Sequence, residues 1–385
     1  MSAIQKARAA AAALTPTIRS AADEIERGGR LPHAVVAAMT AAGVFKLCVP
    51  RAIGGIEADA ETLLAVLETL GAADGSAGWC AMIGATTGLV AGYLDVAEAR
   101  AIFGPADAVA GGVFAPCGRA VRDGSDVIVS GRWPFASGSS HCGWLMGGAV
   151  IEPDGKLPSA SSGPAATRMV IFPAGQATIH DTWNVSGLCG TASNDMEVRD
   201  LRVPYARTVS LVADRPRADG ALYRFPAFGL LSLGIAAVAL GIARGAEEDF
   251  RELAGAKTPT GSRRLLRERA AVQAEVATAV AEVDSARCYL SDAAQRCERE
   301  AENGEISLDA RARLRLAATH ATRQAARAVD RVYDAGGGTS IYRRCPLQRR
   351  FRDVHVTTHH LMVAPATYEL VGRLMLGLET DTSTL

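Results

Sequence analysis

Three of the seven histidines in this 385-residue chain, His355, His359 and His360, lie within six residues of one another. A run rich in arginine precedes them at 349–352. A neutral imidazole can accept a proton near pH 7, and arginine side chains can hold a phosphate group. The stretch therefore suits proton transfer beside a phosphate, and it suits a charged, solvated helix start equally well.

A glycine-rich turn upstream of the histidines is a candidate phosphate cradle. Gly337, Gly338 and Thr339 form the turn, and two arginines follow at 343–344. Glycines let backbone N–H groups approach phosphate oxygens, and arginines add positive charge. Helices also end at glycine routinely, so the pattern fits a plain helix end as well. Arg263, in a turn between two expected helices, is a further candidate, although an exposed loop arginine needs no ligand.

An aromatic stretch at 131–138 has the alternation of a β-strand. Trp133, Phe135 and Ser137 occur at every second position, which predicts that they share one face. A half-buried aromatic strand without a ligand would give the same pattern. Trp79, at the end of a turn that can begin a helix, likewise fits either a pocket wall or a tryptophan packed between helices.

The composition is that of a globular enzyme subunit or a chain of two or three domains. Hydrophobic residues make up 49% of the sequence, and 41 basic residues balance 41 acidic ones. Such an even balance argues against a general nucleic-acid or anionic-membrane surface. The eight cysteines show no zinc-type spacing, so we expect reduced thiols in a cytoplasm and no metal site. The longest apolar run, at 229–243, is shorter than the ~20 residues that span a bilayer, which predicts a buried helix and no membrane contact.

Helical periodicity dominates the two ends of the chain, and β-type patterns occupy the middle. Helices are predicted first at 4–28, 34–42, 61–71 and about 74–93. Short stretches with β-branched and aromatic residues then alternate with turns, at 127–130, 145–151, 169–172 and 196–198, a spacing that suggests a small β-barrel or sandwich. Four long helices are predicted last, at 221–254, 267–302, 308–335 and 357–378, and they favour an antiparallel bundle.

The expected fold class is therefore α+β. Its parts are an N-terminal all-α domain at 1–109, a central β-barrel domain at 110–215 and a C-terminal four-helix bundle at 216–385.

This order of parts, together with three local phrases, resembles the acyl-CoA dehydrogenase superfamily. The phrases are Val-Pro and Gly-Gly within 49–55, Gly-Arg-Trp-Pro-Phe-Ala-Ser-Gly at 131–138, and Gly-Leu-Cys-Gly-Thr-Ala-Ser at 187–193. The resemblance extends over nearly the whole chain, about 5–378. It implies that the 131–138 strand faces a flavin ring.

The dehydrogenases of this superfamily use a carboxylate to remove a proton from an acyl thioester. The Arg-Asp phrase that precedes it is present at 352–353, but His360 and Leu361 stand where the carboxylate would be. The alternative position also fails, because 221–246 contains no acidic residue. Arg-Asp-Val-His, four residues and a second His, together with Ala-Asp-Gly-Ser-Ala-Gly-Trp at 73–79, resembles instead the two-component flavin-dependent monooxygenases, the group D flavin hydroxylases.

That resemblance implies an oxygenase component that receives FMNH2 or FADH2 from a separate NAD(P)H:flavin reductase. With O2 it would form a C4a-hydroperoxyflavin and hydroxylate a small aromatic or heteroaromatic, phenol- or indole-like substrate. His360 would be the base toward the substrate, with His359 as the alternative, and Ser137 would lie near N5 of the flavin. A cytoplasmic homotetramer is implied.

The resemblance also implies a set of flavin-binding residues. Around the ring they are Trp79, Phe114, Trp133, Phe135, Ala136, Ser137, Gly138 and Ser193. At the phosphate they are Arg263, Gly337, Gly338 and Thr339, some of which would contact the flavin of a neighbouring subunit.

Three other functions remain open on the residues. The first is an acyl-CoA dehydrogenase with a displaced base, and the second is an N- or S-oxygenase of the same branch. The third is a flavin-binding or assembly protein that keeps the fold without catalysis. The residues do not decide between FMN and FAD.

Overall fold

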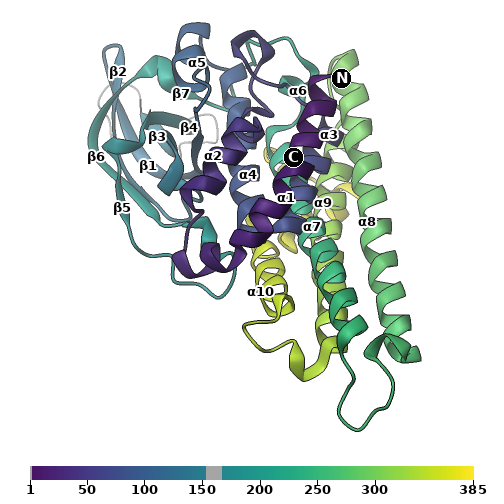
Figure 1. Cartoon of the computed structure of the whole chain (residues 1–385). Coiled ribbons are helices and arrows are strands. Elements are labelled where there is room, and N and C mark those ends of the chain that lie inside the picture. Colours follow the sequence, from purple (N-terminus) through teal and green to yellow (C-terminus); the bar gives the residue numbers. More distant parts are fainter. Residues whose placement is uncertain (1, 153–166) are drawn as a thin grey trace.

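The computed structural model describes residues 2–152 and 167–385, and their arrangement is shown in Figure 1. Two early helices begin at an aspartate whose carboxylate accepts a hydrogen bond from the first helical turn. Asp59 accepts from the Thr62 N–H at 2.7 Å and Asp74 from the Ala77 N–H at 2.9 Å, so both are N-caps. The helices before the sheet are α1 (Ala3–Gly28), α2 (His33–Ala41), α3 (Ala60–Ala73), α4 (Gly75–Thr87) and α5 (Val96–Phe103).

The middle of the chain forms one mixed sheet with its own hydrophobic core. The strand order is β5-β6-β2-β1-β3-β4-β7, with β1 and β3 parallel and the other pairs antiparallel. Trp133 and Phe172 meet inside it, with ring centroids 6.4 Å apart. The strands are β1 (Ala110–Asp123), β2 (Asp126–Trp133), β3 (Trp144–Glu152), β4 (Thr167–Pro173), β5 (Thr178–His180), β6 (Asp195–Pro204) and β7 (Thr208–Val209).

The predicted β-rich stretches at 127–130, 145–151, 169–172 and 196–198 are confirmed as parts of β2, β3, β4 and β6. Three strands, β1, β5 and β7, were not predicted individually. Within the described residues the sheet has two edge strands, β5 and β7, so it is an open sheet around a core instead of a closed barrel.

Helices fill the rest of the chain and form the bundle beside the sheet (Figure 1). They are α6 (Ala221–Arg224), α7 (Ala227–Ala256), α8 (Ala270–Asn303), α9 (Leu308–Gly336), α10 (Pro346–Thr357) and α11 (Ala366–Met375). The predicted helices at 267–302 and 308–335 are confirmed. The predicted helix at 221–254 is interrupted at Phe225, immediately before Pro226.

The prediction of one helix over 357–378 is wrong. Helix α10 ends at Thr357, a short 3₁₀ helix follows at Leu361–Val363, and α11 begins after Pro365. Proline has no N–H to donate and disfavours helical geometry in the residue before it, so a helix cannot run through this position without a kink. The interruption places His360 in a turn between two helices.

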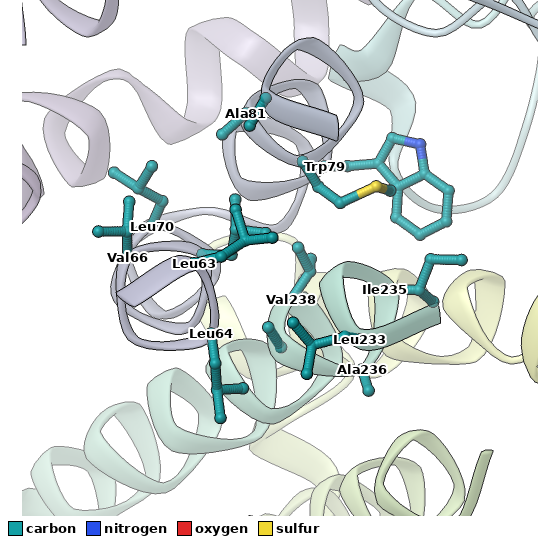
Figure 2. Packing of buried hydrophobic residues seen from close by; sticks show 14 of the residues in the cluster. Leu63, Leu64, Val66, Leu70, Trp79, Ala81, Leu233, Ile235, Ala236 and Val238 are labelled. Atoms are coloured by element: carbon teal, nitrogen blue, oxygen red, sulfur yellow. The ribbon is translucent and has the colours of Figure 1, made fainter. Parts of the chain in front are cut away.

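Helix α7 forms the centre of the hydrophobic core. By length and composition it could cross a membrane, with a mean hydropathy of 1.9 over its most apolar window, but 83% of that window is buried inside the fold. Figure 2 shows Ile235 and Val238 of α7 packed near Leu63 of α3 and Trp79 of α4. A side chain at Gly71 would come within 2.7 Å of the Val238 carbonyl oxygen, so this glycine lets α3 and α7 approach closely. The packing fixes α4 and thereby Trp79.

Candidate active site

A chain of side-chain hydroxyls joins the helical part of the molecule to the sheet. Trp79 on α4 donates its indole N–H to Ser137 Oγ at 3.1 Å. Ser137 Oγ lies 2.7 Å from Ser193 Oγ, which lies 2.6 Å from Thr191 Oγ1. All three hydroxyl residues are buried, with at most 5% of each exposed. The structure thus brings together Trp79, Ser137 and Ser193, which lie far apart in the sequence and were predicted to share a site.

The loop at 186–193, which carries Thr191 and Ser193, is fastened to the bundle. Asp353 on α10 accepts the Leu188 N–H at 2.6 Å, and the neighbouring Arg352 donates to the Ser186 carbonyl oxygen. Leu188 and Ala192 have left-handed backbones, with φ of 50° and 45°. Such conformations cost on the order of 1–3 kcal/mol each and persist only where the surroundings hold them. Asp353 is one of the groups that hold this loop.

His360 lies beside Trp79, the indole that donates to the hydroxyl chain, with the two ring centroids 5.8 Å apart. Its Nδ1 accepts the Met362 N–H at 3.2 Å, so the neutral ring carries its proton on Nε2. Burial, with a smaller contribution from the charge of Arg315, lowers the pKa of His360 to about 4. The ring is therefore neutral at pH 7, and a base with a pKa near 7, as expected from the sequence, does not match this environment.

The other two histidines of the 355–360 cluster lie elsewhere. His359 is exposed, and His355 Nε2 lies 2.8 Å from Asp330 Oδ1. Of the two histidines considered as base, His360 is the one in contact with the site.

The prediction that Trp133, Phe135 and Ser137 share a face is wrong. Strand β2 ends at Trp133, and Phe135 has a positive φ of 66°, which breaks the alternation. Trp133 is fully buried in the sheet core and donates its indole N–H to the Gly148 carbonyl oxygen at 2.7 Å. Phe135 is instead 67% exposed and meets Trp183 edge to face, with centroids 6.1 Å apart. Trp133 thus supports the strand from inside, while Phe135 and Ser137 remain pocket candidates.

The remaining ring-site candidates join the sheet to its neighbours. Phe114 on β1 meets Phe228 of α7 edge to face, with centroids 6.4 Å apart. The Gly138 N–H donates to the Thr191 carbonyl oxygen at 2.8 Å, and the Ala136 N–H to that of Asn194 at 3.0 Å. These bonds hold the turn after β2 against the 186–193 loop.

The phosphate candidates lie together, at the end of the bundle that is lowest in Figure 1. Lys257, at the start of the loop that carries Arg263, donates to the Gly336 carbonyl oxygen at 2.6 Å. Gly337 and Gly338 are exposed, and a side chain at Gly338 would find no atom within 4 Å. The sheet and helix α4, which carries Trp79, lie beside the upper part of the bundle in Figure 1, so one chain does not bring both halves of the predicted site together.

The arginines at 349–352 are engaged in ion pairs and do not form a phosphate site. Arg349 and Arg352 both pair with Glu26 of α1, and Arg350 pairs with Asp249 at 3.0 Å. Their charges attach α10 to α1 and α7.

Comparisons with known proteins identify the family. A model of the acyl-CoA dehydrogenase N-terminal domain matches residues 4–97, and one of the C-terminal domain matches 233–365. Indole-3-acetate monooxygenase of Pseudomonas putida is 31% identical over 362 residues, which cover 93% of this chain and 90% of that protein. The chain belongs to the flavin-dependent monooxygenases with an acyl-CoA dehydrogenase fold. The prediction made from the local phrases is thereby confirmed.

Other flavin-dependent monooxygenases agree with this placement. The oxygenase component of an FADH2-dependent resorcinol hydroxylase from Rhizobium sp. is 30% identical, covering 96% of this chain and 93% of its own. The crystal structure of the HsaA monooxygenase from M. tuberculosis has a TM-score of 0.91 at 26% identity, with 100% of both chains covered. XiaF from Streptomyces sp., solved in complex with FADH2 and glycerol, has a TM-score of 0.90 at 25% identity and covers 98% of this chain and 97% of its own.

The residues of this flavin monooxygenase fit a flavin. Phe135 offers an exposed aromatic ring beside the buried hydroxyl of Ser137, and the turn at Gly338 leaves open space for a phosphate. Among the residues that the structure describes, no three His, Cys, Asp or Glu side chains gather as a metal site requires.

Sequence reasoning missed three residues around the site: Thr191, Asp353 and Arg315. Arg315 on α9 is only 5% exposed. In the described parts of the chain its guanidinium donates to the Thr384 carbonyl oxygen, and its Nε has no partner. Burial lowers the pKa of Arg315 to about 10. Its helical spacing from the buried Ala312 and Thr319 is a signal that could have shown it to face inward.

Proposed function

We propose that this chain is the oxygenase component of a two-component system that hydroxylates a small aromatic or heteroaromatic substrate, phenol- or indole-like. Reduced flavin, FMNH2 or FADH2, comes from a separate NAD(P)H:flavin reductase in the same cytoplasm. One atom of O2 enters the product and the other leaves as water, and the reduced flavin supplies the two electrons.

The observation that carries this proposal is His360 beside Trp79 and the hydroxyl chain. A neutral, half-buried imidazole occupies the position at which acyl-CoA dehydrogenases are expected to place a carboxylate. A ring with a pKa of about 4 is a poor match for removing a proton from an acyl thioester. Its Nε2–H is suited to hold a substrate oxygen or nitrogen by a hydrogen bond.

The substrate class rests on the relatives and on the pocket candidates. Relatives are named for indole-3-acetate and resorcinol, both of which carry electron-rich aromatic rings. Here Trp79, Phe135 and His360 supply aromatic surfaces, and aromatic pairs contribute about 0.5–1.5 kcal/mol beyond the area they bury. Electrophilic hydroxylation needs an electron-rich acceptor, so phenols and indoles are the first candidates.

The separation of the phosphate candidates from the hydroxyl chain supports the proposal that the protein is a homotetramer. A neighbouring subunit would bring its Arg263 and Gly337–Thr339 turn to the flavin that is held at Ser137 of the first. Bound reduced flavin would supply the activation of O2. The chain itself would bind and orient the flavin and the substrate, and it would exclude water.

The test mixes the purified protein anaerobically with FMNH2 or FADH2 and then adds O2 together with indole or a phenol. We expect a hydroxylated product and less H2O2 than the same flavin gives without protein. Tight retention of oxidised FAD that bleaches when an acyl-CoA is added would instead establish a dehydrogenase. Flavin binding without product from any phenol or indole would refute hydroxylation of these substrates.

A further inference from the structure

We infer that Thr191 and Ser193 fix Ser137 as a hydrogen-bond acceptor and so make the site prefer reduced over oxidised flavin. The inference rests on the proposed function and on the expectation, implied by the family resemblance, that Ser137 lies near N5 of the flavin. It follows from counting the protons along the hydroxyl chain.

The direction of the chain is set at Leu188. Its carbonyl oxygen can only accept, and Thr191 Oγ1 donates to it at 2.8 Å. A hydroxyl group has one proton to donate and two lone pairs that accept. The Thr191 proton is therefore used, and in the 2.6 Å contact with Ser193 the threonine must accept.

The same count then passes to Ser137. Because the Ser193 proton goes to Thr191, Ser193 must accept in its 2.7 Å contact with Ser137. The Ser137 proton is thereby used as well. Trp79 can only donate, and it takes one Ser137 lone pair at 3.1 Å. Among the described residues these are the partners of Ser137 Oγ, so one lone pair remains and any further partner must be a donor.

The two redox states of a flavin differ at the atom concerned. Reduced flavin carries a proton on N5 and can donate there, whereas oxidised flavin has a lone pair at N5. A hydroxyl that can only accept can therefore form a hydrogen bond with N5–H of the reduced ring. Its lone pair is repelled by the lone pair at N5 of the oxidised ring. A neutral hydrogen bond gained or lost corresponds to roughly tenfold in affinity.

Leu188, where the chain begins, is held firmly. Its N–H is bound by the Asp353 carboxylate at 2.6 Å, and its carbonyl oxygen also accepts from the Trp183 indole at 3.1 Å. With φ of 50°, the residue cannot relax without losing these bonds. Asp353 is thus a positioning residue for Ser137, four hydrogen bonds away.

The experiment measures the dissociation constants of oxidised and of reduced FMN and FAD under anaerobic conditions, by equilibrium dialysis. We expect the wild-type protein to bind the reduced form at least tenfold more tightly. Ser193→Ala removes the acceptor of the Ser137 proton. Thr191→Val removes the acceptor of the Ser193 proton, so Ser193 can donate to Ser137 and leave the Ser137 proton free. Each change should lower this preference roughly tenfold. Because both variants should give the same result, a folding defect in one of them would still leave the other as a test.

Three further variants complete the design. Thr191→Ser keeps the hydroxyl and should keep the wild-type preference. Ser139→Ala removes a buried hydroxyl of the same turn, one that donates to the Ala192 carbonyl oxygen and lies outside the chain, so it should also change nothing. In a Ser137→Ala background, where the acceptor itself is gone, Ser193→Ala should have no further effect on the preference.

An unchanged preference in both Ser193→Ala and Thr191→Val, with melting temperatures that show a folded protein, would overturn the inference and leave the proposed function intact. Equal wild-type affinity for both redox states would do the same. Failure of the wild-type protein to bind either form would refute the proposed function and, with it, this inference.

Discussion

His360 presents one ring nitrogen, Nδ1, to the main chain, and we propose that the other binds the substrate. The Met362 N–H occupies Nδ1, so the neutral ring can donate from Nε2 as it stands. The sequence placed a histidine here through its match to a family phrase, but burial and the position of Arg315 are properties of the folded chain. Residue types therefore predicted the presence of this imidazole and failed to predict its protonation.

Replacement of His360 distinguishes a hydrogen-bond donor from a base. His360→Ala should leave reduced-flavin binding within about twofold and shift O2 use from hydroxylated product to H2O2, because the substrate loses its partner. His360→Gln keeps an N–H donor and should recover part of the product if donation is the role. Product and H2O2 yields per flavin oxidised give the answer, and unchanged hydroxylation in both variants would remove His360 from the mechanism.

The depressed pKa of His360 also makes a prediction for pH. An unfolded histidine takes a proton at about pH 6.5, whereas the folded ring does so at about 4. Between these values the unfolded state binds more protons, so this residue makes stability fall as pH decreases from 6.5 to 4. Melting temperatures measured across that range should fall less steeply for His360→Gln than for the wild type. Parallel curves would show that His360 titrates normally.

Two buried carboxylates meet at the start of helix α4, where Asp74 caps the helix and Asp353 reaches in from α10. Burial raises the pKa of both, that of Asp353 to about 7, and the charge of Asp74 adds to the rise at Asp353. Arg350 and Arg352 oppose the shift at Asp353. The element that carries Trp79 thus begins at a site where charge is costly.

Asp353→Asn should be more stabilising at high pH than at low pH. The folded state holds the Asp353 proton up to about pH 7 and the unfolded state only to about 4, so wild-type stability decreases as pH rises through this window. Asparagine keeps the acceptor for Leu188 and lacks the charge. We expect similar melting temperatures at pH 4 and a higher one for the variant at pH 8.

The control is Asp284→Asn, at an exposed surface pair of α8, where little change is expected at either pH. A gap between Asp353→Asn and the wild type that does not grow with pH would contradict the shifted titration.

Element types were predictable where periodicity was long and unopposed. Helices α8 and α9 follow their apolar spacing, whereas Pro365 divides the last predicted helix and Phe135 leaves the strand pattern at a positive φ. Strand β1 was missed because its first part, a run of glycines and small residues, pairs only with β3, which lies beyond the next strand in the sequence. The domain boundaries at 109/110 and 215/216 stay predictions.

At the scale of the whole molecule, the two halves of one predicted binding site lie in different parts of the chain's fold (Figure 1). The hydroxyl chain begins at Trp79 of α4 and continues at Ser137, after β2. The Arg263 and Gly338 loops lie at the far end of the bundle (Figure 1). Local sequence could suggest both halves as flavin contacts but could not tell that they lie apart in one chain. The arrangement fits a flavin site to which two neighbouring subunits contribute residues.

Arg263→Ala tests this arrangement. The side chain lies in an exposed loop, so its loss should leave the melting temperature unchanged while weakening reduced-flavin binding about tenfold, as expected for one charge-assisted hydrogen bond. Arg119→Ala, at an exposed position of β1, is the matched control and should bind flavin normally. Equal affinity in the two variants would exclude Arg263 from the flavin site.

The bond between Asp353 and Leu188 spans 165 residues of sequence, and this has a consequence for protein synthesis. A ribosome adds about 5–20 residues per second, so on the order of ten seconds or more separate the emergence of the loop from that of the carboxylate that holds it. During this interval the strained loop lacks the hydrogen bond from Leu188 to Asp353 that holds it. Helix α1 is likewise synthesised long before Arg349 and Arg352 of α10, with which its Glu26 forms ion pairs. We expect nascent chains that stop short of α10 to engage chaperones and to bind no flavin.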